Sequence, residues 1–348
     1  MQVLVIGAGV AGLACSLELA SAGLSVQVID RGPRLGGGSC SWFAGGMLAP
    51  WCEAVDANGL VTRLGQEALQ WWKQHTPGYV CKGSLVLAQG RDRGELERFA
   101  RRSSNHQRLD AEALSHLEAD LGPRFAQALH FPQEAHMDPR AAMCSLRDSL
   151  EAMGVVIQYE TTEGGYDGAA DWIIDCRGMG AREDLPDLRG VKGEMLLVRT
   201  DEVQLSRPIR LLHPRIPLYI VPRGEGLFMI GATMIESDDR KRITARSMIE
   251  LLQGAYALHP AFAEAEVVEI GTDVRPAFPD NLPKIRKRGK RVFVNGLYRH
   301  GFLMSPTLAK WTKNVVIDNA YYPEVMDEYS MQRSRSTSRS KEPGNRFA

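Results

Sequence analysis

The sequence predicts an α/β fold, and two patterns indicate it. The chain opens with a short apolar strand, a glycine-rich turn, a helix and a second strand, and a strand that leads through a glycine into a helix occurs again near residue 296. The composition, with 44% hydrophobic and 24% charged residues among 348, is that of a packed globular protein. A chain of this length usually forms about two domains.

The charge and the cysteine content argue against several classes of protein. Lys and Arg number 42 and Asp and Glu number 42, so there is no bulk positive field to hold a nucleic acid. The six cysteines include no C-x-x-C pair and indicate reduced thiols. The N-terminus lacks the basic segment of a signal peptide, and no apolar run approaches the ~20 residues that span a bilayer. We therefore expect a soluble, cytoplasmic protein that binds neither nucleic acid nor membranes.

The first glycine-rich turn carries the pattern G-x-G-x-x-G at Gly7, Gly9 and Gly12, between an apolar strand over residues 3–6 and a helix over residues 13–22. Gly7 permits the tight turn, Gly9 lets the backbone approach a pyrophosphate, and Gly12 lets the helix pack closely on the strand. The N-terminus of the helix then faces the phosphates. This order of elements predicts a Rossmann-like unit that binds a dinucleotide.

The residues that follow bear on which dinucleotide is bound. A strand over residues 26–29 ends at Asp30, whose carboxylate would accept hydrogen bonds from the adenosine ribose. The same fingerprint serves NAD, NADP and FAD, and Arg31 would be able to meet a 2′-phosphate. The small residues of segment 36–50 would let the backbone lie against a large flat ligand. A strand over residues 291–295 leads into a second helix N-terminus, which suits the negative charge at the pyrimidine end of a reduced flavin.

Five motifs occur in order along the chain. They are Gly7, Gly9, Gly12 and Asp30; segment 44–48; segments 219–223 and 231–234; segment 274–276; and Gly296, Arg299 and Gly301. Together they resemble the FAD-dependent glycine oxidases of thiamine biosynthesis, within the D-amino acid oxidase superfamily, and the match extends from residue 2 to about residue 319. The resemblance implies FAD, bound without a covalent link. The cofactor-binding residues that it implies are Gly7, Gly9, Val10, Ala11, Gly12, Asp30, Arg31, Cys40, Ser41, Gly45, Gly46, Met47, Gly296, Leu297, Tyr298, Arg299, His300, Gly301, Phe302 and Leu303.

The resemblance also implies how the domains are organised. An FAD-binding Rossmann-like domain would be interleaved with an α+β substrate domain built on a largely antiparallel sheet. We expect the FAD-binding domain to comprise residues 1–80, 131–190 and 271–329, the substrate domain to comprise residues 81–130 and 191–270, and residues 330–348 to form a disordered basic tail. Within the first domain, Asp138 and Pro139 predict the start of a helix. The link over residues 160–171 is shorter than the resemblance implies, so the adenine contact that such a link supplies is not assigned to a residue.

A helix and several strands are expected in the substrate domain. A polar helical region would extend from residue 91 to about residue 125, before strands around residues 192–198, 218–221 and 227–233. A further helix over residues 245–257 would pack on the outer side of the sheet.

The resemblance implies oxidative deamination of glycine or another small amino acid, such as sarcosine or a small D-amino acid, by hydride transfer to flavin N5. Reoxidation by O2 would give hydrogen peroxide, and the imine would either hydrolyse or pass to thiazole synthesis. Since the cofactor carries the chemical step, we expect no catalytic residue beyond the flavin.

Binding a substrate carboxylate calls for a planar, permanently charged and bidentate partner. By the resemblance, Arg275 takes this role, and the Tyr219 hydroxyl adds a bond to the same carboxylate. Arg299 lies in the flavin-facing turn and would touch the substrate or the flavin edge, or merely cap the turn. Met47 and Met234 would line the cavity as apolar walls or serve as ordinary core residues.

Other functions stay open at this point. A dehydrogenase of the same fold, acting on D-amino or N-methyl amino acids, would pass electrons to another acceptor, and oxygen uptake separates it from an oxidase. A flavin-binding scaffold or sensor would have no amine substrate. RNA modification draws support from the basic run over residues 284–291 and from the tail, but we interpret the run as a solvated hairpin.

The expected partners are therefore a small amino acid and O2. His136 and His300 invite catalytic roles, but they belong to no His/Cys/Asp cluster with metal-ligand spacing, and we expect no metal site. The resemblance suggests a homo-oligomer.

Overall fold

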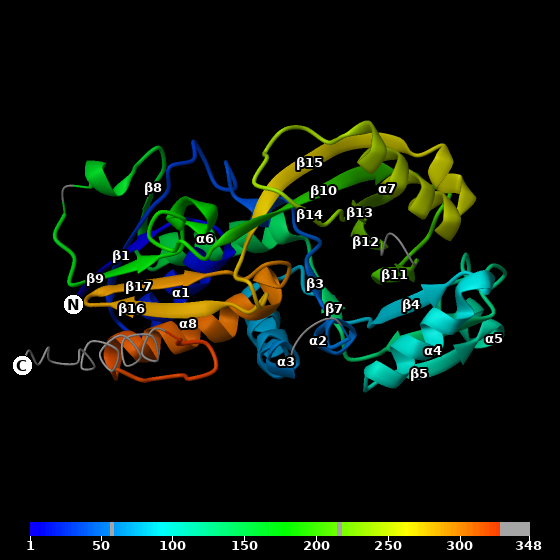
Figure 1. Cartoon of the computed structure of the whole chain (residues 1–348), viewed down its shortest axis with the longest axis horizontal. Helices are drawn as coiled ribbons and strands as arrows, with labels where there is room; N and C mark the ends of the chain where they lie inside the picture. Colours follow the sequence, from blue (N-terminus) through cyan, green and yellow to red (C-terminus); the bar gives the residue numbers. More distant parts are fainter. Residues whose placement is uncertain (56–58, 167, 214–217, 328–348) are drawn as a thin grey trace, which may run out of the picture.

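The computed structural model describes residues 1–55, 59–166, 168–213 and 218–327. Two β-sheets lie in two halves of an elongated molecule (Figure 1). The expected tail over residues 330–348 lies outside the described residues. Within the described residues, no helix combines the length and the apolar character that crossing a membrane requires.

The first half is built on a six-stranded sheet. Its strands, in spatial order, are β16 (Lys284–Arg288), β17 (Arg291–Asn295), β9 (Trp172–Asp175), β1 (Gln2–Ile6), β2 (Ser25–Ile29) and β8 (Val156–Gln158). All neighbours are parallel except β16 and β17, which form an antiparallel hairpin. Strands β1, β9 and β17 are mostly buried, as expected for a parallel sheet covered on both faces.

Helices cover this sheet and share its main core. They are α1 (Val10–Ser21), α3 (Gly59–His75), α6 (Pro139–Ala152) and α8 (Gly301–Ile317). The predicted start of α6 is confirmed, because the Asp138 carboxylate accepts hydrogen bonds from the N–H groups of Arg140 and Ala141, and Pro139 is the first helical residue. Helices α1 and α8 pack together and direct their N-termini to the end of the sheet where β1 and β17 finish (Figure 1).

The second half is built on a nine-stranded sheet. Its strands, in spatial order, are β14 (Ile235–Glu236), β10 (Arg189–Arg199), β13 (Leu227–Gly231), β12 (Leu218–Gly224), β11 (Ile209–Leu212), β4 (Ser84–Ala88), β6 (Gln127–Phe131) and β5 (Gln107–Asp110), with β15 (Glu266–Ala277) also paired to β10. The pairing is antiparallel except between β4 and β11, which confirms a largely antiparallel sheet.

The two faces of this sheet serve different cores because side chains alternate along a strand. Leu196, Ile220 and Ile230 face the core under α7 (Ala245–Leu258). Met195 and Tyr219, from the opposite face, pack in a smaller cluster that includes Phe43 and Met47 from the first half. This second face is therefore the one turned toward the other half of the molecule.

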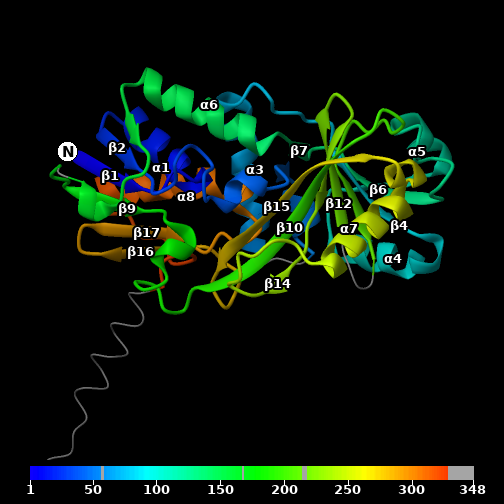
Figure 2. The same ribbon diagram turned by 90° about the horizontal axis from the view of Figure 1, so that it is seen from above.

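Long strands join the two halves. Figure 2 shows β10 and β15 extending from one half into the other, and β15 stays hydrogen-bonded to β10 across the boundary expected at residues 270 and 271. We therefore assign all of β15 to the second sheet. A short pairing of β3 (Met47–Leu48) with β7 (Ala135–His136) and the four-residue helix α2 (Pro50–Glu53) also lie between the halves.

The sequence predicted a helical region over residues 91–125, and this prediction is wrong in part, because the region also contains a strand. It contains α4 (Arg93–Arg102) and α5 (Ala111–Leu117), but edge strand β5 separates them. The residues of β5 are largely exposed and polar, so the strand has no apolar alternation by which to recognise it. Five single 3-10 turns complete the described elements: η1 (Cys40–Phe43), η2 (Gly90–Asp92), η3 (Glu163–Gly165), η4 (Gly178–Ala181) and η5 (Pro260–Ala263).

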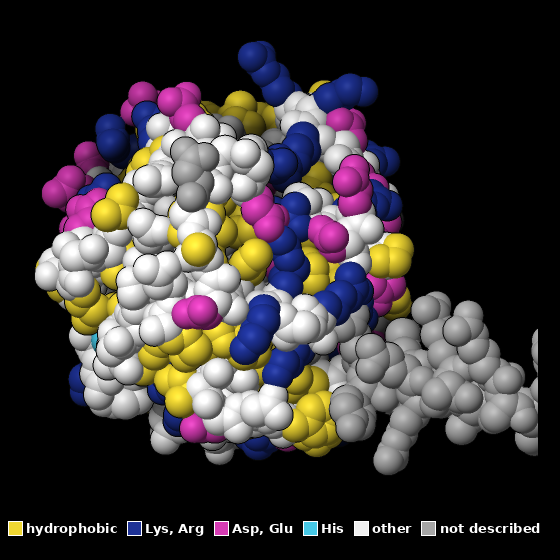
Figure 3. Space-filling view, turned by 90° about the vertical axis from the view of Figure 1, so that its left-hand side faces the viewer, with side chains coloured by type: hydrophobic (Ala, Val, Ile, Leu, Met, Phe, Trp, Pro, Cys, Tyr) yellow, Lys and Arg dark blue, Asp and Glu magenta, His cyan; other side chains and the backbone are white. Residues whose placement is uncertain are grey.

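The basic run over residues 284–291 forms β16, the turn at Gly289 and the first residue of β17. Lys and Arg side chains form a band on the end of the molecule shown in Figure 3. The expectation of a solvated hairpin holds for Arg288 and Lys290, which are exposed. It is wrong for Arg286, which is buried in ion pairs with Asp187 and Asp327.

Candidate active site

The glycine-rich turn after β1 has a backbone conformation and backbone contacts that only glycine can adopt without strain. Gly7 has a φ of +104°, and a Cβ there would lie 2.7 Å from the Cys176 carbonyl oxygen. A Cβ on Gly12 would lie 1.8 Å from the Gly7 carbonyl oxygen, so α1 packs directly on the turn. Gly9 precedes α1 and has no side chain with which to cover the helix N-terminus. The turn is therefore tight and open over the first N–H groups of α1.

A cavity of about 260 Å³ begins over this N-terminus. Its walls come from the glycine turn, the end of β2, η1, the link between β8 and β9, η4 and the turn before α8. The predicted residues that line it are Gly7, Gly9, Val10, Ala11, Asp30, Arg31, Cys40, Ser41, Leu297, Tyr298 and Gly301.

The residues of this cavity fit FAD. The first turn of α1 contains no acidic residue, so its positive end is open to an anion such as a pyrophosphate. Asp30 holds the turn in place, because its carboxylate accepts the N–H groups of Ala8 and Gly32 at 2.6 Å each. Residues Thr161, Thr162 and Glu163 also line the cavity, and with them the short β8–β9 link reaches the site.

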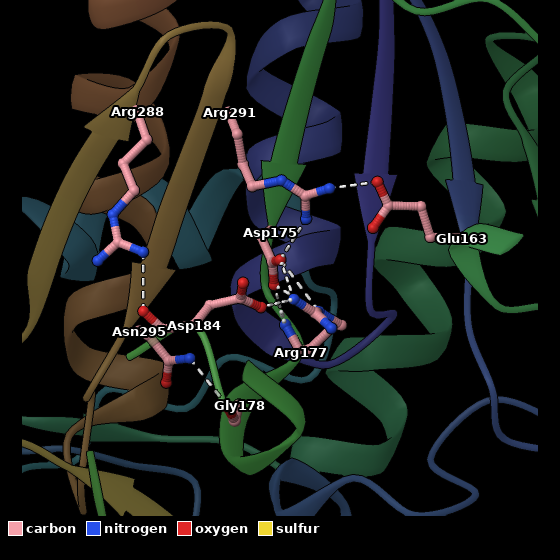
Figure 4. A network of polar contacts seen from close by, with 8 residues as sticks. All are labelled: Glu163, Asp175, Arg177, Gly178, Asp184, Arg288, Arg291 and Asn295. Carbon is pink, nitrogen blue, oxygen red and sulfur yellow. Dashed lines mark hydrogen bonds and ion pairs between the residues drawn. The ribbon is translucent and has the colours of Figure 1, made fainter. Parts of the chain in front are cut away.

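A network of polar contacts lies beside the cavity, where β9 ends and η4 begins (Figure 4). Asp175 is fully buried at the end of β9 and accepts hydrogen bonds from Arg177 at 2.6 Å and from Arg291 at 2.8 Å. Asn295 donates to the Gly178 carbonyl oxygen at 2.9 Å. Because Arg177, Gly178 and Asn295 all line the cavity, this network fixes its wall.

A second cavity, of about 130 Å³, adjoins the first, and Val10, Cys40, Ser41, Tyr298 and Gly301 line both. Its walls come from segment 43–47, from the inner face of the nine-stranded sheet and from the N-terminus of α8. The predicted residues that line it are Gly45, Gly46, Met47, Tyr219, Met234, Arg275, Arg299, His300, Phe302 and Leu303.

Two predicted residues line neither cavity. Gly12 lies beneath the turn, against the Gly7 carbonyl, and Gly296 has a φ of +74° in the turn after β17. A Cβ on Gly296 would lie 2.1 Å from the Phe278 ring, so this glycine allows the close packing of the turn. Their contribution to the site is through backbone shape.

Arg275 lies near the end of β15 with its guanidinium over Gly193 of β10. A Cβ on Gly193 would lie 2.3 Å from Arg275 Cζ, so the space that the guanidinium occupies exists because residue 193 is glycine. Arg275 Nη1 donates to the Thr233 carbonyl oxygen at 3.0 Å, which engages one of the five N–H groups. The side chain is thereby oriented at the wall of the second cavity.

Tyr219 lines the same cavity from β12. Its ring packs on two glycines, since a Cβ on Gly45 or Gly231 would lie 2.8 or 3.2 Å from the ring. Burial raises the pKa of the Tyr219 hydroxyl, an effect that the nearby Arg275 opposes. The phenol is therefore protonated at neutral pH and able to donate a hydrogen bond.

Arg299 is held by a residue that the sequence did not single out. Its Nη2 lies 2.6 Å from Glu53 Oε2, and Arg210 Nη1 lies 3.4 Å from Glu53 Oε1. Burial acts to raise the pKa of Glu53, but Arg299, Arg210 and His300 outweigh it and lower the pKa to about 2. Glu53 is thus an ionised carboxylate in the cavity wall, between two arginines.

The carboxylate of Glu53 and the guanidinium of Arg210 are functional candidates that sequence reasoning missed. Glu53 ends a helix of only four residues and Arg210 lies 157 positions later in β11, so no local motif connects them. The predicted His300 lies beside Glu53, with Nδ1 3.7 Å from the carboxylate. His136 instead lies buried in β7, outside both cavities. In the described part of the chain, no three His, Cys, Asp or Glu side chains are grouped to hold a metal ion.

Comparison with known proteins identifies relatives along nearly the whole chain. The Rhizobium etli protein ThiO, which is named a thiamine biosynthesis oxidoreductase, is 53% identical to this chain over 316 residues. The match covers 89% of this chain and 94% of ThiO. A glycine oxidase of Pseudomonas aeruginosa is 27% identical over 351 residues, covering 88% of this chain and 92% of that protein. The crystal structure of glycine oxidase from Geobacillus kaustophilus shares the fold, with a TM-score of 0.78 at 24% identity over 92% of this chain and 95% of that one.

A family model described as DAO, FAD dependent oxidoreductase, matches residues 2–314. That range includes the glycine turn, both sheets and the start of α8. The predicted fold class, a Rossmann-like FAD-binding unit interleaved with a unit on a largely antiparallel sheet, agrees with this match. The chain belongs to the DAO family of FAD-dependent oxidoreductases.

Proposed function

We propose that this protein oxidises glycine or another small amino acid with FAD and O2, releasing hydrogen peroxide. The observation that carries the proposal is the second cavity, which adjoins the cofactor cavity and has the Arg275 guanidinium in its wall. The relatives named glycine oxidase support the substrate class. The relative named for thiamine biosynthesis supports a role in which the imine product feeds thiazole synthesis.

In this proposal, residues of this chain bind and orient the substrate. Arg275 forms a charge-assisted, bidentate contact with the substrate carboxylate, and the Tyr219 hydroxyl donates to the same group. The bond from Arg275 to the Thr233 carbonyl fixes the guanidinium before the substrate arrives. Such preorganisation aligns the α-carbon for reaction. When bound, FAD supplies the acceptor for the hydride of the substrate C–H bond.

The cavity walls also set the size of the substrate. Phe43, Met47 and Leu218 line the cavity with apolar side chains, which leave room for an amino acid with a small side chain only. Apolar walls exclude water, and this strengthens the contact between Arg275 and a carboxylate. The N-terminus of α8 at Gly301 would stabilise negative charge at the near end of the flavin.

The test is a visible spectrum of the FAD-loaded protein without oxygen, before and after addition of glycine, sarcosine or D-alanine. We expect the flavin band to bleach with at least one of these and to return on aeration with formation of hydrogen peroxide. Bleaching that persists in air, and that another electron acceptor reverses, would instead indicate a dehydrogenase. A flavin band that none of the three amino acids bleaches would refute the proposed substrate class.

A further inference from the structure

The carboxylate of Glu53 has a place in the cavity wall that substrate binding at Arg275 does not explain. It lines the same cavity as Arg275, and its side chain is 18% exposed there. Its oxygens meet Arg299 at 2.6 Å and Arg210 at 3.4 Å. One acidic and two basic side chains thus form a charged cluster, which we call the Glu53 cluster, in the same cavity as the proposed carboxylate site.

The position of Glu53 is built into the fold. The fully buried carboxyl group of Glu134 accepts the N–H groups of Trp51 at 3.0 Å and Cys52 at 2.7 Å, which fixes helix α2 just before Glu53. Ser84 donates to the other oxygen of Glu134. These three hydrogen bonds to Glu134 hold the end of α2 in place, and they thereby keep the Glu53 side chain at the cavity wall.

Two other acidic side chains line the cavity, and each lies beside a cation that is not Arg210 or Arg299. Glu194 is fully buried and lies 3.2 Å from the ammonium of Lys192, and Asp273 lies 3.6 Å from Arg240. Glu53 is the acid that lies between two arginines of the cavity wall. The guanidinium group of arginine binds carboxylates through two parallel N–H groups. If Glu53 carried no charge, Arg210 and Arg299 would therefore offer a ligand a second anion site.

We propose that Glu53 is a specificity-determining residue, whose negative charge disfavours ligands that carry a second carboxylate in addition to the one bound at Arg275. The inference rests on the proposed function, because it takes Arg275 as the site of the first carboxylate. A negative charge in a cavity of low dielectric acts over several ångströms, so it repels a second anion without touching it. Specificity of this kind arises from a repulsive element as well as from attractive contacts.

The test compares ligands that differ in one charge and almost nothing else. Malonate and malonamate, and the longer succinate and succinamate, are pairs in which an uncharged amide replaces one carboxylate, and none of the four has an amine to oxidise. Their dissociation constants are measured from the change that each causes in the flavin spectrum of the FAD-loaded protein. In Glu53→Gln we expect the ratio of dianion to monoanion dissociation constants to fall by about tenfold or more for at least one pair.

Two variants separate the effect of charge from that of structure. Glu53→Asp keeps the charge, and we expect it to keep most of the wild-type ratio. Arg299→Gln removes a positive charge from the same cluster and should raise the ratio, which gives a result of opposite sign if Glu53→Gln does not fold. Glu151→Gln, which removes an exposed charge on α6, is the matched control and should leave the ratio unchanged.

An unchanged ratio in Glu53→Gln, with FAD retained, would overturn the inference. So would an equal fall in Glu53→Gln and Glu151→Gln, because the effect would then come from overall charge. A different measurement tests the proposed function: it fails if glycine, sarcosine and D-alanine do not bleach the flavin band of the wild type. The binding ratios need no turnover, so they test Glu53 whatever the oxidised substrate is.

Discussion

The guanidinium of Arg275 occupies the space where a side chain at residue 193 would lie, with Cζ 2.3 Å from the position of a Cβ on Gly193. The two residues come from paired strands, β15 and β10, that join the halves of the molecule. The position of the proposed carboxylate site is thus set by a missing side chain on a neighbouring strand, as well as by the arginine itself.

This relationship predicts that Gly193→Ala will impair substrate binding without removing any charge. A methyl group at 2.3 Å from Cζ must displace the guanidinium from the position in which it bonds to Thr233. We expect kcat/KM for glycine to fall by about 5- to 150-fold, a loss of about 1–3 kcal/mol in transition-state binding, with FAD retained. The measurement is the rate of flavin reduction across glycine concentrations.

Gly94→Ala is the control for this change. Gly94 lies in α4 with nothing within 4 Å of its Cβ position, so an added methyl group meets no atom. Wild-type glycine kinetics in Gly193→Ala would show that Arg275 does not hold the substrate in the position that we propose.

Removing the guanidinium itself should have a larger effect. In Arg275→Ala we expect a loss on the order of 2 to 5 kcal/mol in transition-state binding of glycine, because a substrate carboxylate would be left buried and unpaired. FAD should remain bound, since the change leaves intact the glycine turn and the N-terminus of α1, which line the cavity that Arg275 does not reach. Anaerobic flavin reduction measures the loss, and Arg246→Ala, an exposed arginine on α7, provides the control. Unaltered reduction kinetics in Arg275→Ala would contradict the site.

The glycine turn should decide cofactor affinity. A Cβ on Gly9 would point toward the hydroxyl groups of Ser39 at 3.0 Å and Ser41 at 3.5 Å, in the wall of the cofactor cavity. We therefore expect Gly9→Val to weaken FAD binding by at least about tenfold, because the larger side chain keeps the pyrophosphate from the backbone. Titration of the apoprotein with FAD, followed by quenching of flavin fluorescence, measures the change. Gly94→Val, in α4 at a position with open space around it and outside both cavities, should bind FAD as the wild type does.

The glycine turn and α6 were predictable from sequence because local chemistry specifies them. The turn needs a glycine at position 7, where φ is +104°, and α6 needs a capping side chain at Asp138. Both requirements involve neighbouring residues and can be recognised in the sequence. The Glu53 cluster could not be predicted in this way. It depends on Glu134 fixing α2 and on β11 lying beside β4, contacts that join residues far apart in the chain.

Arg286 shows the same limit within a single strand. The basic run over residues 284–291 has no apolar pattern that would show which of its charges are buried. The structure buries the Arg286 guanidinium over the Phe278 ring at 4.4 Å and pairs it with Asp187 and Asp327. Those partners come from a loop before β10 and from the segment after α8, and only the tertiary fold brings them to the hairpin.

Glu134 predicts a pH dependence of stability. Burial raises the pKa of this carboxyl from 4.5 to about 8, although Ser84 and the N–H groups of Cys52 and Trp51 act to lower it. The folded protein therefore keeps a proton there that the unfolded chain releases near pH 4.5. The stability that this proton contributes is complete below pH 4.5 and is lost as the pH rises to about 8.

The variant that tests this is Glu134→Gln, which has nearly the same shape and does not titrate. The free energy of unfolding of the wild type, relative to that of Glu134→Gln, should fall on the order of 3 kcal/mol from about pH 5 to about pH 8. Unfolding of the two FAD-loaded proteins by urea, at a series of pH values, measures this difference. Glu151→Gln, on the exposed face of α6, should follow the wild type across the same range. A constant difference between the wild type and Glu134→Gln would mean that Glu134 is ionised in the folded protein, and that Ser84 and the two backbone N–H groups stabilise the carboxylate more than burial destabilises it.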